Sequence, residues 1–215
     1  MIINKRLNDK ELLKHIYKAA FEYSKLVENS FLLVAKNRSS EYFWFQCRFE
    51  KKNFMHLFGI DSKTLNANEF YNRCKRYNEG KGDGITIQDC SPSRNHSRST
   101  VNEKSSCCAD ILKLKDAKYM KVGLKDKISQ YVDFTYGYGN IATLGFKNIK
   151  DTSFPVTLIP RTIDEFISEK YTIIFIFKKQ IKEEKYVECI YEIKKGLLGE
   201  LYNELSDELR TYFEK

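Results

Sequence analysis

The sequence predicts an α+β fold in which helices precede an antiparallel sheet. Hydrophobic residues repeat at helical spacing near the amino terminus and again near the carboxyl terminus. From residue 118 the pattern changes to short β-branched and aromatic runs separated by glycine or charged turns. We expect one domain over 1–215, since this length buries one substantial core. Its parts are a helix and hairpin (1–50), a helical layer (51–117), and an antiparallel β-meander closed by a C-terminal helix (118–215).

Composition favours a folded protein with a polyanionic partner. Hydrophobic residues make up 42% of the chain, and 37 Lys and Arg against 29 Asp and Glu give a net charge of +8. No secretory signal or membrane span is recognisable, so we expect a cytoplasmic protein with reduced cysteines and no membrane contact. With three histidines and no HxxxH, HExxH or CxxC spacing, we expect neither a metal site nor a cofactor.

The first 50 residues predict a helix followed by a hairpin. Asn8 and Glu11 have the spacing of a capping box, and an apolar stripe then continues to about Glu28. Two aromatic or β-branched runs, 30–35 and 41–49, are separated by the turn-forming KNRSS.

One face of the second run carries Trp44 and Arg48 beside other polar and aromatic side chains. Such a face is able to stack bases. The simpler interpretation is an edge strand that packs Trp44 under a loop.

The segment 52–74 places a histidine between two short helices. Phe54, Leu57 and Phe58 give one turn a buried face, and Gly59 offers the permissive backbone that ends it. His56 therefore lies near a corner. From spacing alone, a histidine among aromatics is more often a core or boundary residue than a catalyst.

The polar segment 89–104 predicts a mobile loop followed by the start of a helix. Arg94 and Arg98 have the chemistry to touch a backbone phosphate, although a solvated loop is an equally good interpretation. Ser99 or Thr100 is the expected helix cap. Lys104 would then lie in the first turn, where the helix dipole disfavours a cation, so it is a candidate to face an anion.

Strand-like runs follow over 118–124, 131–137, 141–147, 171–179 and 186–193. The segment 154–160 (FPVTLIP) is bracketed by two prolines, which suits a sheet edge or a chain crossing because proline donates no ladder hydrogen bond. Apolar residues at four-residue steps predict one continuous helix over 197–213 that packs back on the sheet.

The octapeptide NFMHLFGI at 53–60 resembles the F-x-H-L-x-G-I signature of phage-associated nuclease families grouped under the Barnase, EndoU, colicin and RelE-like (BECR) fold. Matches at 99–104 (STVNEK), at 154–160 and in the last strand pair follow in the same order. Phe58 departs from the pattern, which more usually has Thr or Cys there. The resemblance implies a helical layer followed by a four-stranded antiparallel sheet.

The implied activity is metal-independent endoribonuclease cleavage by 2′-hydroxyl attack, as in a toxin or effector of a phage or mobile element. Such chemistry needs a base, cations for the phosphorane charge and an acid for the leaving oxygen. His56 is our first choice because imidazole titrates near neutrality. The candidates for charge stabilisation and phosphate binding are Lys104, Arg161, Lys178 and Thr157. The candidates for further RNA contacts are Arg94, Arg98, Trp44, Arg48 and Tyr191.

Each candidate also has a structural interpretation: Lys178 as the solvated end of a strand, Thr157 as a strand residue, Arg161 as a surface cation. A second acid or base is missing unless His96 supplies it from its loop.

Two other functions stay open. The first is an inactive protein of this fold that binds a host or defence-system target, as an anti-defence or antitoxin-type inhibitor. The second is a nucleic-acid-binding module without catalysis. Convergence of His56 with at least two of the charge-stabilising candidates favours the enzyme, and dispersal favours binding.

Overall fold

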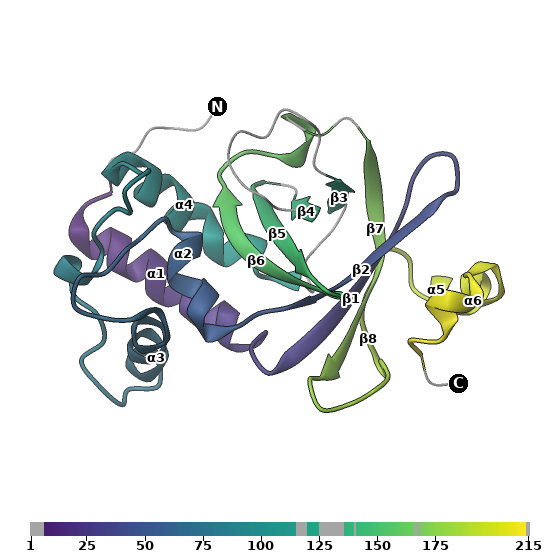
Figure 1. The fold of residues 1–215 in the computed structure, drawn as a ribbon, viewed down its shortest axis with the longest axis horizontal. Coiled ribbons are helices and arrows are strands. Elements are labelled where there is room, and N and C mark those ends of the chain that lie inside the picture. The colour runs from purple at the N-terminus through teal and green to yellow at the C-terminus, as the bar shows by residue number, and fades with distance from the viewer. Residues whose placement is uncertain are drawn as a thin grey trace.

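A computed structural model of the chain describes residues 7–114, 120–124, 136–139, 141–165, 167 and 169–213 (Figure 1). The helices are α1 (Asp9–Ser24), α2 (Phe54–Leu57), α3 (Ala67–Asn78), α4 (Arg98–Ile111), α5 (Leu197–Leu201) and α6 (Asp207–Arg210). The strands are β1 (Asn29–Lys36), β2 (Tyr42–Arg48), β3 (Lys121–Leu124), β4 (Tyr136–Gly139), β5 (Thr143–Ile149), β6 (Thr152–Ile159), β7 (Lys170–Gln180) and β8 (Glu188–Glu192). Short 3₁₀ turns are η1 (Lys51–Asn53), η2 (Ile87–Asp89), η4 (Ile163–Glu165) and η5 (Tyr202–Glu204).

The strands form one sheet in the order β1-β2-β6-β5-β4-β3-β7-β8, and β1 also pairs with β7. This extra pairing closes the strands from β1 to β7 into a ring, with β8 attached to β7 outside it. Neighbouring strands are antiparallel except β2 and β6, which pair in parallel at Cys47 and Ser153. The predicted α+β class, with its N-terminal helix and hairpin, is confirmed.

The sheet is larger than the four-stranded antiparallel sheet that the resemblance implies, because the hairpin β1–β2 joins the later strands. Strand β6 lies between β2 and β5, but its register with β2 consists of the pair Cys47 and Ser153, so the segment 154–160 pairs with β5 alone, as its predicted edge position expects. A register shift at Gly145 and Phe146 puts Pro155 opposite Phe146, and such an irregularity is where a sheet tolerates proline. Of the strand predicted over 131–137, residues 131–135 lie outside the described residues.

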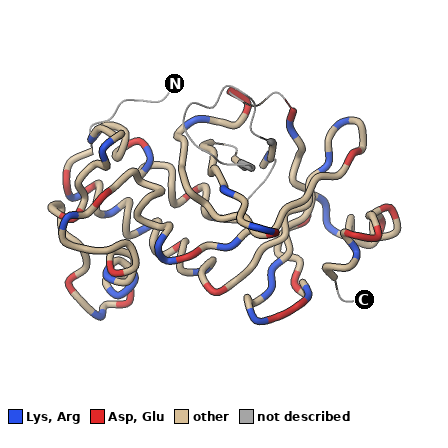
Figure 2. Tube along the Cα trace, viewed as in Figure 1, with Lys and Arg blue, Asp and Glu red and all other residues tan. Residues whose placement is uncertain are grey.

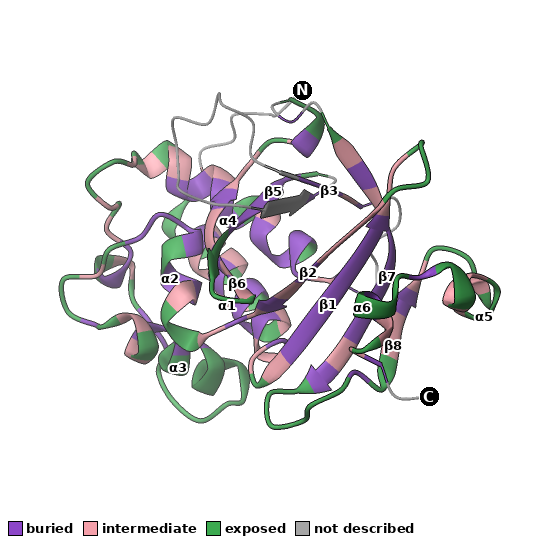
Figure 3. Ribbon diagram, turned by 45° about the vertical axis from the view of Figure 1, so that its right-hand side comes forward, coloured by how far each residue is buried: buried purple, intermediate pink, exposed green. Residues whose placement is uncertain are grey.

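Two hydrophobic clusters cover the sheet. The larger joins the helices to the sheet and includes Tyr23, Phe54 and Tyr71, all buried. Helix α1 begins as predicted, because Asn8 and Glu11 form a reciprocal capping box with bonds of 2.9 and 3.0 Å. Figure 3 shows β1 buried along most of its length. The helices therefore pack on the sheet through this larger cluster.

The smaller cluster lies under the C-terminal helices and contains Leu205, Leu209 and Phe213. These residues are buried as predicted, but the single helix over 197–213 is wrong. Leu205 is extended (ψ 142°), and the Ser206 hydroxyl accepts from Leu209 N at 3.2 Å to start α6. A serine that caps a new turn competes with continuation of the helix.

Candidate active site

His56 lies on the outer surface of the short helix α2. Phe54, Met55 and Leu57 of the same turn are buried, and the His56 side chain is exposed. The aromatic neighbours therefore hold the turn in the core without covering the imidazole. Gly59 follows in the left-handed conformation (φ 70°), as the end of this turn requires.

His96 packs directly against the backbone that follows His56. A Cβ on Gly59 would lie 2.8 Å from Cγ and Cδ2 of the His96 ring, so only glycine leaves room for the imidazole. Ser93 strengthens the contact, because its N–H donates to Gly59 O (2.8 Å) and its Oγ lies 2.8 Å from His96 Nδ1. The segment expected to be a mobile loop is thus tied to the helical corner.

Lys104 is the second member of this group. Its side chain is 4% exposed, and its Nζ lies 2.9 Å from His96 Nε2. Burial lowers the pKa of Lys104 to about 8. Burial, followed by the charge of Lys104, lowers the pKa of His96. The arrangement fits a neutral imidazole that accepts through Nε2 from an ammonium and donates from Nδ1 to Ser93.

The position of Lys104 corrects the expected helix start. Ser97, rather than Ser99 or Thr100, caps α4, and its hydroxyl accepts from Thr100 N at 3.1 Å. Lys104 therefore lies beyond the first turn, and its low pKa comes from burial rather than from the helix dipole.

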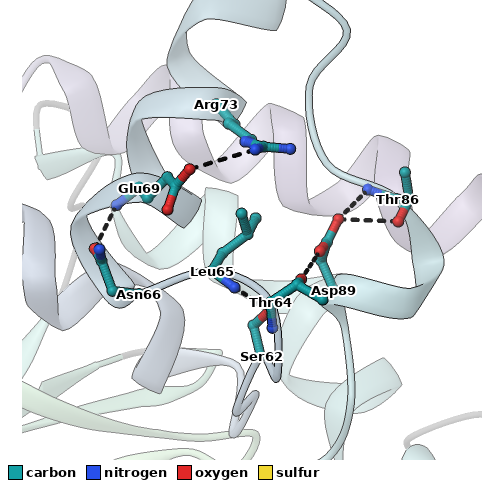
Figure 4. A network of polar contacts seen from close by, with 8 residues as sticks. All are labelled: Ser62, Thr64, Leu65, Asn66, Glu69, Arg73, Thr86 and Asp89. Carbon is teal, nitrogen blue, oxygen red and sulfur yellow. Dashed lines mark hydrogen bonds and ion pairs between the residues drawn. The ribbon is translucent and has the colours of Figure 1, made fainter.

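A network of polar contacts around the Asp89 carboxylate joins the segment after α2 to the turn η2 (Figure 4). Asp89 accepts hydrogen bonds from the Thr64 hydroxyl and from Thr86, through N at 2.7 Å and Oγ1 at 2.9 Å. Burial alone would raise the pKa of Asp89, but these donors outweigh it and hold the pKa below its ordinary value. Asp61 N donates to Ser91 O at 2.9 Å, so the network lies at the base of the loop that carries His96.

Thr157 lies on strand β6, and Arg161 follows the end of this strand. Figure 1 shows β6 beside α2 and α4, and Asn53 Nδ2 donates to Pro155 O at 2.9 Å just before α2 begins. Thr157 is half-buried, and Arg161 is exposed two residues beyond the strand. Strand β6, which carries Thr157, therefore adjoins both α2, which carries His56, and α4, which carries Lys104.

Lys178 is not part of this group. Its ammonium forms an ion pair of 2.5 Å with Glu188 of the neighbouring strand β8. Tyr191, on the same strand, is 8% exposed and belongs to the larger core cluster. Figure 1 shows β7 and β8 on the opposite side of the ring from α2 and α4.

The other predicted RNA contacts divide into two places. Arg94 is exposed two residues before His96, and Arg98 begins α4, where it donates to Cys90 O (3.2 Å) and binds Asp9 (2.9 Å). Trp44 is half-buried against the smaller cluster, which includes residues of the C-terminal helices, and the Nε of Arg48 is buried on the same strand. Only the two arginines of the loop lie near His96 in the chain.

Ser93 and the pairing of His96 with Lys104 are the features that sequence reasoning missed. The available signal was the spacing of eight residues between a histidine and a lysine across a helix cap, which is too general to identify a pair. Among the described residues, no group of three or more His, Cys, Asp and Glu could hold a metal ion. None of the described helices is long and apolar enough to cross a membrane.

Comparison with known families gives one matching family model. A family model described as phage-Barnase-EndoU-ColicinE5/D-RelE like nuclease4 (PBECR4) matches residues 15–195. This range contains the His56 corner, the Lys104–His96 pair and strand β6. No curated protein and no solved structure matches the chain.

Proposed function

Since the chain belongs to the PBECR4 family of phage Barnase-EndoU-ColicinE5/D-RelE like nucleases, we propose that it cleaves RNA by metal-independent attack of a ribose 2′-hydroxyl. The observation that carries the proposal is the buried Lys104 ammonium bonded to His96, on the glycine that ends the His56 turn. Two titratable groups with different environments are what an acid–base pair needs.

His56 is the base in this proposal. Its imidazole is exposed to an incoming strand, and an imidazole nitrogen is able to accept a proton from a hydroxyl. It takes the proton of the 2′-hydroxyl as the 2′-oxygen forms its bond to phosphorus. The bond from phosphorus to the 5′-oxygen then breaks, and a 2′,3′-cyclic phosphate remains.

The leaving 5′-oxygen receives the proton that Lys104 and His96 share. His96 donates from Nδ1, the nitrogen now facing Ser93 Oγ, and Lys104 replaces the proton at Nε2. A pKa of about 8 keeps this proton available at neutral pH without holding it too firmly. The second acid that the sequence did not identify is therefore this pair.

Thr157 and Arg161 are assigned to the phosphate. An arginine forms paired hydrogen bonds to phosphate oxygens, and a hydroxyl donates one. Lys178 is left out of the proposal because Glu188 binds its ammonium elsewhere.

Cleavage of RNA in EDTA tests the proposal. We expect wild type and the control His15→Ala to cut, since His15 lies on α1 outside the site, and His56→Ala to be at least about 100-fold slower. Equal inertness of wild type and His56→Ala would instead support an inhibitor that binds a host target. Loss of wild-type cutting on EDTA addition would contradict the metal-independent mechanism.

A further inference from the structure

A groove of about 550 Å³ lies between α1 and the end of α3, outside the site described above. Its wall on α1 carries Lys10, Lys14 and Lys18, and its other wall includes Tyr77 and Asp83. Basic and acidic residues are spread over all the described parts of the trace in Figure 2. Such a local row of lysines is therefore more informative than the net charge of the chain.

The three lysines recur every four residues along one side of α1, a rise of about 6 Å per step. Lys18 lies 3.5 Å from Asp110, whereas Lys10 and Lys14 are exposed and form no ion pair with any described residue. Unpaired ammonium groups in a row suit successive phosphates of a nucleic-acid strand.

An exposed aromatic ring lies in the same groove. Tyr77 is 47% exposed and stacks on Tyr17, with ring centroids 4.0 Å apart and planes inclined by 19°. One face of Tyr77 is thus supported by another ring, while much of its surface remains open to solvent. An exposed ring beside cations is the arrangement with which proteins hold unpaired bases.

Tyr17 is itself fixed in place. Its hydroxyl donates to Ile85 O (2.8 Å) and accepts from Ile85 N (2.9 Å). Gly84 makes this possible, because it has φ 78° and a Cβ there would collide with the Tyr17 hydroxyl. The platform under Tyr77 is therefore rigid before any ligand binds.

We propose that this groove binds a segment of single-stranded RNA, with phosphates at Lys10 and Lys14 and a base stacked on Tyr77. The choice of RNA rests on the proposed function. The Asp9–Arg98 ion pair of 2.9 Å joins the start of α1, the helix that forms one wall of the groove, to α4, the helix that carries Lys104. In this proposal the groove holds a part of the substrate strand beyond the cleaved bond.

Fluorescence anisotropy of a labelled 12-nucleotide single-stranded RNA tests the proposal. The background is the full chain with His56→Ala, so that binding is measured without cleavage. We compare Lys10→Ala/Lys14→Ala with Lys182→Ala/Lys185→Ala, a control pair of exposed lysines in the β7–β8 loop with the same change in charge. We expect the groove pair to weaken binding about tenfold and to lower the salt-dependence slope by about 1.4. Equal losses in both pairs would overturn the inference.

Tyr77 provides the second arm. Tyr77→Ala should weaken RNA binding by about 5-fold or more, and Tyr77→Phe should bind as wild type does, since a phenyl ring still stacks. Equal losses in both variants would overturn base stacking. The two proposals fail separately. If wild type cuts RNA but the groove variants bind RNA as tightly as their His56→Ala parent, the groove proposal is contradicted. If wild type never cuts RNA but the groove variants lose binding as expected, the cleavage proposal is contradicted.

Discussion

The ammonium Nζ of Lys104 lies 2.9 Å from Nε2 of His96, in a position where the lysine side chain is 4% exposed. A buried lysine normally destabilises a fold unless an acid neutralises it. Here the partner is a neutral imidazole ring, so its hydrogen bond offsets only part of the free-energy cost of burying the ammonium.

Lys104→Met should change stability in a pH-dependent manner. The folded pKa, about 8, is below the ordinary value of 10.5, so at pH 7 folding buries a charge that the unfolded chain solvates. The free-energy cost of burying this charge is present in full below pH 8 and disappears as the pH rises to 10.5. In urea unfolding, the free energy of unfolding of wild type relative to that of Lys104→Met should therefore increase by on the order of 3 kcal/mol between pH 7 and pH 10.5. A difference that is constant with pH would contradict the burial of a charged lysine.

Cleavage should decline above about pH 8, because Lys104 then loses the proton that the leaving oxygen requires. The profile of kcat/KM against pH measures this alkaline limb. His15→Ala should leave the limb in place. A rate that is level from pH 7 to pH 9.5 would show that Lys104 supplies no proton.

Gly59→Ala should impair both folding and catalysis. The new methyl group would meet the His96 ring and would also occupy a left-handed position, at a cost of about 1–3 kcal/mol for the backbone alone. Gly80→Ala is the matched control, since Gly80 has φ 68° and no atom within 4 Å of the added Cβ. Unfolding and initial-rate measurements should show backbone strain in both variants and a loss of kcat only in Gly59→Ala. Equal kcat values would mean that the His96 position does not matter.

Asp89→Asn should destabilise the loop under the site. Thr64 and Thr86 hold the pKa of Asp89 below its ordinary value, so its contribution is present above about pH 4 and is lost as pH falls through the folded pKa. We expect a deficit of about 1–3 kcal/mol at pH 7 that narrows in acid. Asp61→Asn, an exposed change in the same region, should cost little at any pH. A deficit for Asp89→Asn that persists at pH 2 would point to packing instead of charge.

The position of a helix was predictable from the sequence where a single local signal determines where the helix begins. The capping box at Asn8 and Glu11 and the apolar stripe of α1 needed no tertiary information. The start of α4 was ambiguous, because Ser97, Ser99 and Thr100 are all able to cap a helix. A shift of two or three residues in that start decides where Lys104 lies on the helix, and the sequence alone contains no preference among the three caps.

Other features depended on long-range pairing. Lys178 meets Glu188 through the register of β7 and β8, and Pro155 is accommodated by a shift in its partner strand β5. The His96–Gly59 contact joins residues that lie 37 positions apart in the sequence. Hydrophobic periodicity reports burial and not partner identity, so none of these contacts was available in advance.

Product analysis on matched oligonucleotides tests the central claim most directly. One strand is all ribose, and the other has 2′-deoxy residues at each position that the enzyme cuts. In EDTA, the account predicts 2′,3′-cyclic phosphate ends from the ribose strand, none from the deoxy strand, and at least a 100-fold lower yield with Lys104→Met than with wild type. Cleavage of the deoxy strand at the same positions would contradict 2′-hydroxyl attack and the acid–base roles assigned to His56 and Lys104.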